Sequence, residues 1–133
     1  MSASTSPSTY RPGYCNIGRR QRYRRLAAGL GTAVLGAAYV AACLAGPVPR
    51  VLLPGVFVPL AISFEYLFQA HGSFCVVLAL AGRYDFTDRD GSGPAGEVAA
   101  PSDRRADRLR AAKLSAAAVG LAAVVTLAIV VAA

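Results

Sequence analysis

Three long apolar runs, separated by polar segments, dominate the pattern of side chains along this chain. The first covers residues 26–45 without a charge, the second lies between Arg50 and Arg83, and the third covers residues 114–133. A helix of about 20 residues is roughly 30 Å long, which matches the hydrocarbon core of a bilayer. The pattern therefore predicts an all-α integral membrane protein: a helical hairpin with spans at about 26–45 and 53–81, and a third C-terminal transmembrane helix.

The second apolar run is too long for one upright helix, so two interpretations stay open. A single helix could run from about Leu53 or Pro59 to Ala81, because proline is tolerated in a first turn. Alternatively, a helix could end near Ala70, with Gly72 as the break and a short second piece after it. We favour the single helix.

The polar segments differ in composition and predict different behaviour. Residues 1–14 are rich in Ser, Thr and Pro, which predicts a disordered tail. Residues 16–25 predict a short basic helix at the membrane interface, and residues 83–104 predict a flexible loop. The hairpin then occupies residues 15–82, and residues 105–133 form the third helix with a basic lead-in. We expect one membrane unit and no separate soluble domain.

The segment that enters the first span carries the most specific spacing in the chain. Asn16 can cap the helix that follows it, because its side chain can accept from backbone N–H groups one turn on. Arg22, Gly29 and Gly36 recur every seven residues, and Arg25 lies on the same stripe. The glycines allow another helix to approach closely. The arginines are expected to bridge to lipid phosphates or to the carbonyls at a helix end.

This spacing resembles the motif that opens the YgaP-like inner-membrane domain family, Asn-(Val/Ile)-Gly-x-x-(Asp/Glu)-Arg-x-x-Arg-x-x-x-Gly. The matching positions are Asn16, Ile17, Gly18, Arg22, Arg25 and Gly29. Cys75 and Gly82 match a second family pattern, Cys-Pro-x-x-x-x-x-Gly, although Val76 replaces the proline and Gln21 replaces the acidic residue of the first. The family is best known as the membrane anchor of some rhodanese domains. The resemblance covers about residues 15–83 and leaves out the third span, so it implies a helical hairpin rather than a reaction.

Lysine and arginine are distributed unevenly among the polar segments. Six precede the first span, one lies in the connection that follows it, and seven lie between residues 83 and 113. Cytoplasmic segments carry the excess of positive charge. We therefore expect a protein of the cytoplasmic membrane with its N-terminus and second loop in the cytoplasm and its C-terminus outside. The net charge of +7 flanks apolar runs, so the expected partner is anionic lipid headgroups and not nucleic acid.

Four polar side chains are candidates for chemistry. Glu65 is an acid within an apolar run, so it is expected to face protein or a water-filled crevice. It is then either a functional group or, in the interpretation we favour, a hydrogen-bonding residue between helices. His71 and Cys75 are one helical turn apart. Neighbouring arginines could lower the pKa of Cys15 and make its thiol reactive. No spacing typical of a metal site and no nucleophile–base–acid set occurs, so no metal, cofactor or enzymatic activity is expected.

These patterns predict a small multi-pass membrane protein that acts as a non-catalytic structural or accessory subunit. It would pack with itself or in a larger membrane complex through small-residue helix faces, of which Ala116 and Gly120 form one in the third run. The alternative function is the handling of sulfur or thiols at the membrane surface through Cys15 and Cys75.

Overall fold

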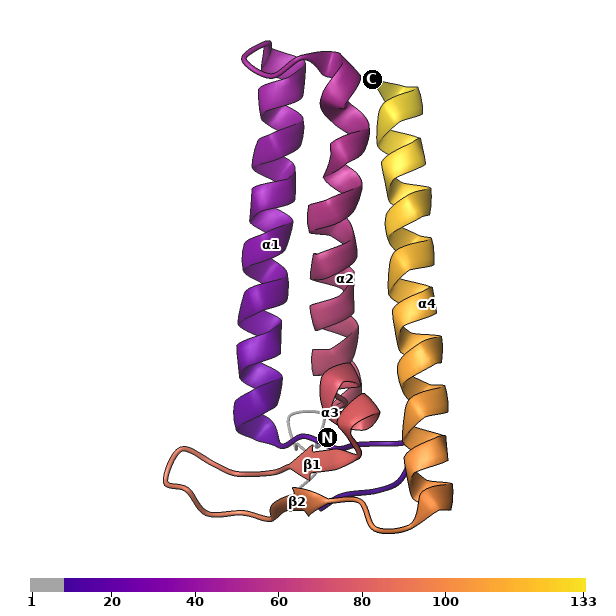
Figure 1. Ribbon diagram of the computed structural model, residues 1–133. Coiled ribbons are helices and arrows are strands. Elements are labelled where there is room, and N and C mark those ends of the chain that lie inside the picture. The colour runs from indigo at the N-terminus through magenta and orange to yellow at the C-terminus, as the bar shows by residue number, and fades with distance from the viewer. Residues whose placement is uncertain (1–8) are drawn as a thin grey trace, which may run out of the picture.

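The computed structural model describes residues 9–133, and the chain is mostly helical (Figure 1). Its helices are α1 (Arg19–Ala45), the 3-10 helix η2 (Arg50–Val56), α2 (Phe57–Gly72), α3 (Val76–Ala81) and α4 (Pro101–Ala132). The three long helices lie side by side, with α2 between α1 and α4. This confirms the predicted fold class, a helical hairpin with a third C-terminal helix. A short basic helix was expected over residues 16–25, either separate or continuous with the first span. Residues 19–25 form the first part of α1, and residues 16–18 precede the helix.

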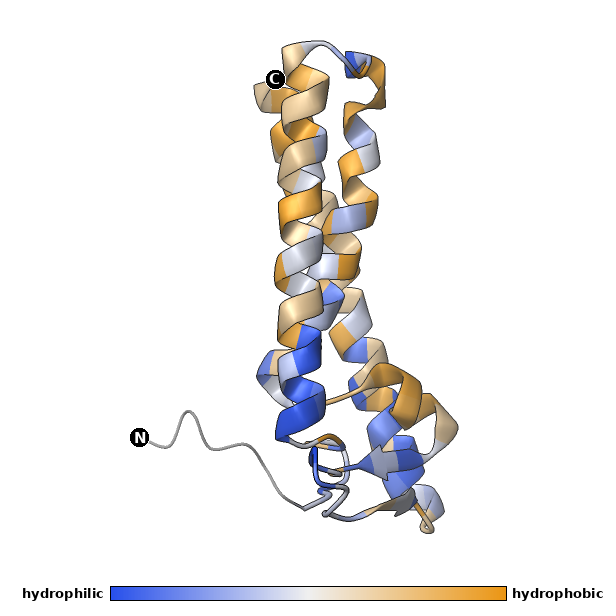
Figure 2. Cartoon of the chain, turned by 90° about the vertical axis from the view of Figure 1, so that its left-hand side faces the viewer, coloured by the Kyte–Doolittle hydropathy of each residue, from blue (hydrophilic) through white to orange (hydrophobic). Residues whose placement is uncertain are grey.

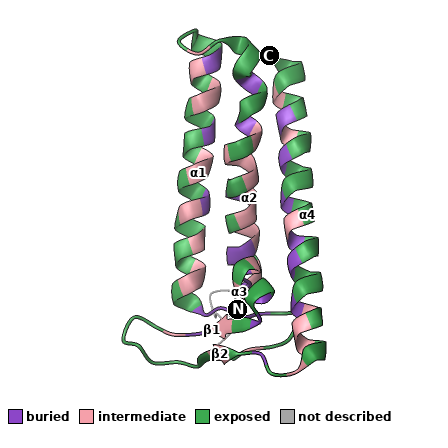
Figure 3. Ribbon diagram, viewed as in Figure 1, coloured by how far each residue is buried: buried purple, intermediate pink, exposed green. Residues whose placement is uncertain are grey.

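Three helical segments within residues 9–133 are long and apolar enough to cross a membrane: Arg19–Ala45, Arg50–Gly72 and Pro101–Ala132. Exposed residues occur along all three (Figure 3), and they include large hydrophobic side chains such as Val34 and Val124. Such a surface suits contact with lipid. Hydrophilic residues gather at one end of the helices (Figure 2). The chain is a small multi-pass membrane protein.

The two helices of the hairpin approach closely at the predicted glycine stripe. Gly29 and Gly36 are both buried. A Cβ at Gly29 would lie 2.7 Å from the side chain of Leu67, and one at Gly36 would lie 3.6 Å from Pro59. The Ser63 hydroxyl donates to the Gly29 carbonyl at 2.8 Å. The stripe therefore brings α1 and α2 together within one chain.

A different face of small residues packs α4 against α2 and α3. Ala111, Ala118 and Ala122 are buried along α4, with at most 1% of their surface exposed. The predicted small-residue pair lies elsewhere on the helix: Ala116 and Gly120 are exposed, and nothing lies within 4 Å of a Cβ placed at Gly120. The pair is therefore left for contacts outside the chain.

The second apolar run is broken, so the prediction of a single helix over 53–81 was wrong. α2 ends at Gly72, and Ser73 adopts a left-handed conformation with φ 51°. The Ser73 carbonyl accepts the backbone N–H groups of Asn16 at 3.1 Å and Ile17 at 3.4 Å. Those bonds come from a distant segment and replace the continuation of the helix. The alternative with a break near Gly72 is the observed one.

The loop expected to be flexible contains a small antiparallel sheet. Strands β1 (Arg83–Asp85) and β2 (Ala95–Glu97) pair with Arg83 opposite Glu97. The two side chains form an exposed ion pair with an N–O distance of 3.6 Å. Asp85 also exchanges backbone hydrogen bonds with the segment before α1, since its N–H donates to the Asn16 carbonyl at 2.9 Å. β1 is therefore tied both to β2 and to the segment before α1.

The N-terminal segment docks on α4, although a disordered tail over residues 1–14 was expected. Asp107 is fully buried, and its carboxylate accepts from the Tyr10 hydroxyl and the Gly13 N–H, each at 2.7 Å. The Tyr10 ring stacks on Tyr84 with centroids 5.1 Å apart. A buried carboxylate requires such donors, so the prediction was wrong for residues 9–14. Its remainder, residues 1–8, lies outside the described residues.

Candidate functional site

The two separate matches to the family motif meet at the polar end of the hairpin. The Asn16 amide spans the backbone of Cys75: its Nδ2 donates to the carbonyl at 3.0 Å, and its Oδ1 accepts the N–H at 2.6 Å. α1 begins at Arg19 with no side-chain cap, so the predicted capping role of Asn16 was wrong. The Cys75 N–H lies at the helix break, and Asn16 supplies its acceptor. The Cys75 carbonyl accepts from Asn16 and also from the Ala79 N–H at 3.0 Å.

The motif glycines Gly18 and Gly82 stand where space is tight or where the backbone conformation favours glycine. A Cβ at Gly18 would lie 3.2 Å from the Cα of Phe86, in the segment after β1. Gly82 ends α3 with φ +68°, a left-handed conformation that glycine adopts without strain. Gly18 therefore lets the segment before α1 approach the segment after β1, and Gly82 lets the chain turn from α3 into β1.

Arg22 bridges α1 to the end of α2. Its Nε donates to the Ala70 carbonyl at 2.9 Å, within the last turn of α2. The last carbonyls of a helix have no partner within the helix, and they carry partial negative charge. A guanidinium is therefore a favourable donor at this point. This contact is the helix-end bridge considered for the motif arginines.

Arg25 occupies the centre of a polar network. Its Nε donates to Gln69 Oε1 at 3.1 Å, its Nη1 donates to Gln21 Oε1 at 2.8 Å, and its Nη2 donates to Cys75 Sγ at 2.8 Å. One planar guanidinium thus joins α1 to α2 and to the start of α3. A lysine ammonium cannot reproduce this arrangement of donors in one plane.

Gln21, which replaces the acidic residue of the family motif, is suited to its neighbours here. It accepts from Arg25, and its Nε2 donates to Asp85 Oδ2 at 3.1 Å. Burial raises the pKa of Asp85, but hydrogen bonds from Thr87 and Gln21 outweigh it and leave the pKa below its ordinary value. A glutamate at position 21 could accept from Arg25 but could not donate to an ionised Asp85.

Glu65 connects the middle helix to both of its neighbours. Its Oε1 accepts from Gln69 Nε2 at 3.1 Å and from the Ser115 hydroxyl of α4 at 2.8 Å. Because Gln69 in turn accepts from Arg25, a continuous chain of hydrogen bonds crosses α1, α2 and α4. This geometry fits the hydrogen-bonding role between helices that we favoured for Glu65.

The same side chains line a cavity of about 450 Å³. Arg25, Glu65, Gln69 and Cys75 supply its polar groups, and Tyr66 and hydrophobic residues complete its walls. The cavity therefore places a carboxylate, a guanidinium and a sulfur atom beside an apolar surface.

The two candidate thiols face different partners. Cys15 Sγ donates to the Thr9 carbonyl at 3.4 Å, whereas Cys75 Sγ accepts from Arg25 at 2.8 Å and from the Leu78 N–H at 3.5 Å. Burial raises the pKa of the Cys15 thiol, and the opposing effect of Arg11 is smaller. The expectation that arginines lower the pKa of Cys15 was therefore wrong.

His71 takes no part in this cluster. It is exposed in the last turn of α2, and the break at Ser73 separates it from Cys75, so the two do not share a helical face. Within residues 9–133, no group of three or more His, Cys, Asp or Glu side chains is arranged to hold a metal ion.

Several contributors were not singled out from the sequence. Tyr10, Asp107 and Ser115 were missed because their partners lie far away in the chain: Tyr10 and Asp107 are separated by 97 residues, and Ser115 and Glu65 by 50. Gln69 did carry a local signal, since it stands four residues after Glu65, on the same face of a helix.

Comparisons of this chain with protein-family models, with curated proteins and with solved structures find no match. The resemblance to the YgaP-like family therefore rests on the motif positions alone and stays a prediction.

Proposed function

We propose that this chain is a non-catalytic structural or accessory subunit of the cytoplasmic membrane. One observation supports this most: the polar side chains of the motif and of the second apolar run hydrogen-bond to other parts of the same chain. These side chains are Asn16, Arg22, Arg25 and Glu65. Residues engaged in this way hold three helices together at their polar end. They account for the motif without a reaction.

The proposed orientation has the N-terminal segment and the β1–β2 sheet in the cytoplasm and the C-terminus outside. Two observations support it: the hydrophilic residues gather at one end of the helices, and the C-terminus lies at the other (Figure 2). Positive charge favours the cytoplasmic side. In this orientation the basic end meets anionic headgroups of the inner leaflet, and no nucleic acid is involved.

The proposal includes packing with a second copy or within a larger membrane complex, and α4 offers the surface for it. Gly29 and Gly36 are already covered by α2, whereas Ala116 and Gly120 are exposed. Small residues four apart allow another helix to approach closely.

The size of the full chain in a mild detergent tests this packing. We expect an assembly larger than a monomer, and Gly120→Leu should reduce it to a monomer because the larger side chain separates the helices. Gly31→Leu is the matched control, since Gly31 also has open space around it, and it should leave the size unchanged. A wild-type monomer, or equal behaviour of both variants, would contradict the proposal.

A second candidate function, thiol chemistry at Cys75, is favoured by one contact. The Arg25 guanidinium lies 2.8 Å from the sulfur, beside a cavity, and reactive cysteines are commonly found next to such cations. Cys15 is not part of this candidate, because burial raises its pKa. Mass spectrometry of the chain purified without reductant should then find a modified Cys75 and an unmodified Cys43. An unmodified Cys75, or equal modification of Cys75 and Cys43, would remove this candidate.

A further inference from the structure

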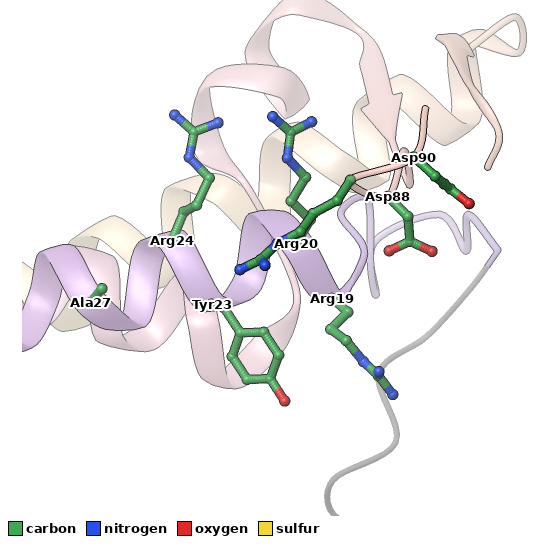
Figure 4. Close-up of a pocket in the computed structure, with 8 residues that line it drawn as sticks. Arg19, Arg20, Tyr23, Arg24, Ala27, Asp88 and Asp90 are labelled. Atoms are coloured by element: carbon green, nitrogen blue, oxygen red, sulfur yellow. The ribbon is translucent and has the colours of Figure 1, made fainter. Parts of the chain in front are cut away.

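A second cavity lies on the surface at the polar end of the molecule; all eight residues that line it are exposed, and four of them are arginines. It has a volume of about 750 Å³ and lies between the first turns of α1 and the loop that joins β1 to β2. Its polar lining comes from Arg19, Arg20, Tyr23, Arg24, Asp88 and Arg89, with Asp90 at the same loop. Figure 4 shows Tyr23 and the arginines of α1 beside the loop that carries the two aspartates.

The arginines of this cavity are not neutralised by the carboxylates beside them. Four guanidinium groups and two carboxylates line it, so positive charge is in excess. In the described part of the chain, the one ion pair within 4.0 Å joins Arg83 to Glu97, outside the cavity. The Asp90 carboxylate is instead held by the N–H and hydroxyl of Ser92, at 2.9 and 2.6 Å. Arg20 also interacts electrostatically with Asp85, outside the cavity, but none of the four arginines forms an ion pair within 4.0 Å among the described residues. The excess of guanidinium groups around the cavity favours an anion.

We infer that this cavity binds a phosphate group, carried either by the headgroup of an anionic lipid or by a soluble phosphate compound. Guanidinium groups bind phosphate oxygens through two parallel hydrogen bonds, which gives specificity as well as charge. The position favours the lipid source. Tyr23 and Arg24 lie three and two residues before the uncharged run that starts at residue 26, and tyrosine is enriched where a helix meets the headgroups. This inference rests on the proposed membrane placement but not on the proposed packing through α4.

Binding to the full chain in an uncharged detergent tests the cavity. The probes are short-chain phosphatidic acid, phosphatidylcholine of the same chain length, and inorganic phosphate, and native mass spectrometry reads the bound fraction. Arg24→Gln with Arg89→Gln should weaken phosphatidic acid binding by about tenfold or more, because two charges near the phosphate are lost. Arg105→Gln with Arg108→Gln removes the same charge from exposed positions of α4 and should change binding less than about twofold. An equal loss in both double variants would overturn the site.

A variant that is expected to strengthen binding distinguishes the loss of a binding site from misfolding. Asp88→Asn removes a negative charge from the cavity and should strengthen phosphatidic acid binding, which a folding defect cannot do. Unchanged or weaker binding would overturn the inference. Binding of phosphatidic acid that millimolar inorganic phosphate does not displace identifies a lipid headgroup, and full displacement identifies a soluble phosphate. The assembly size of each variant, measured on the same samples, shows separately whether the packing through α4 holds.

Discussion

Hydrogen-bonding capacity decides which side chain suits each position of the polar network. Gln21 donates to Asp85 and accepts from Arg25, and a glutamate would instead place two carboxylates together. We expect Gln21→Glu to lower the free energy of unfolding in detergent by about 1–2 kcal/mol. Adding Asp85→Asn should restore most of the loss, because the new amide can donate to the glutamate. A double variant no more stable than Gln21→Glu would contradict this account.

The planar geometry of the guanidinium group decides whether lysine can replace an individual arginine of α1. Arg22 and Arg25 each donate to acceptors on α2, whereas Arg20 and Arg24 are exposed. Replacing the first pair with lysine should lower the free energy of unfolding by about 1–3 kcal/mol, as charge-assisted bonds are lost. The same replacement at Arg20 and Arg24 should change it little. Thermal unfolding in detergent without anionic lipid makes the comparison, and equal losses would mean that charge alone matters.

Close packing governs the pairing of the long helices. An alanine at Gly29 would bring its Cβ to 2.7 Å from the Leu67 side chain, while Gly31, on the exposed side of α1, has nothing within 4 Å. We expect Gly29→Ala to lower the free energy of unfolding by about 1–3 kcal/mol, since the added methyl forces the helices apart. Gly31→Ala should be neutral or stabilising by up to about 1 kcal/mol. Denaturation in detergent measures the free energy of unfolding of both variants. An unchanged value for Gly29→Ala would show that α1 and α2 are not closely packed at this point.

Protonation holds the N-terminal segment in place. Burial and the Asp107 carboxylate raise the pKa of Tyr10 above its ordinary value of 10.0, and burial raises that of Cys15 above 9.0. The folded chain therefore holds these protons more tightly than the unfolded chain. Their stabilising effect is complete below the ordinary pKa values and is lost as the pH rises above them. The unfolding temperature of the wild-type chain should fall above about pH 9. The fall should be smaller in Tyr10→Phe, which lacks one of the two titrating groups. An identical fall in the wild type and in Tyr10→Phe would contradict the contact between Tyr10 and Asp107.

The elements differ in how far the sequence determines them. The long helices follow from length and hydropathy, and the Gly29 stripe follows from a local repeat of seven residues, so both could be predicted. The break at Ser73 depends on hydrogen bonds from Asn16 and Ile17, and the pairing of Asn16 with Cys75 spans 59 residues. Local patterns carry no information on such contacts. The sequence therefore predicts several residues of the polar network one by one, but the hydrogen bonds that join them are seen only in the structure.

At the scale of the whole molecule, the helices form a layer whose two ends differ in character. The N-terminal segment, the β1–β2 sheet and the basic start of α4 lie at one end, and the C-terminus lies at the other (Figure 1). All three long helices meet the length and hydropathy of a membrane span. We propose that the chain crosses the membrane three times with its polar end in the cytoplasm.

Labelling of intact cells with a membrane-impermeant maleimide tests this claim most directly. The native thiols Cys15, Cys43 and Cys75 are first replaced, and single cysteines are then introduced at Pro47, Ser92 or Ala133. We expect the sites at Pro47 and Ala133 to react in intact cells, whereas Ser92 should react only after the cells are permeabilised. Labelling of Ser92 in intact cells would reverse the orientation, and a protected Ala133 beside a reactive Pro47 would show that α4 does not cross the membrane.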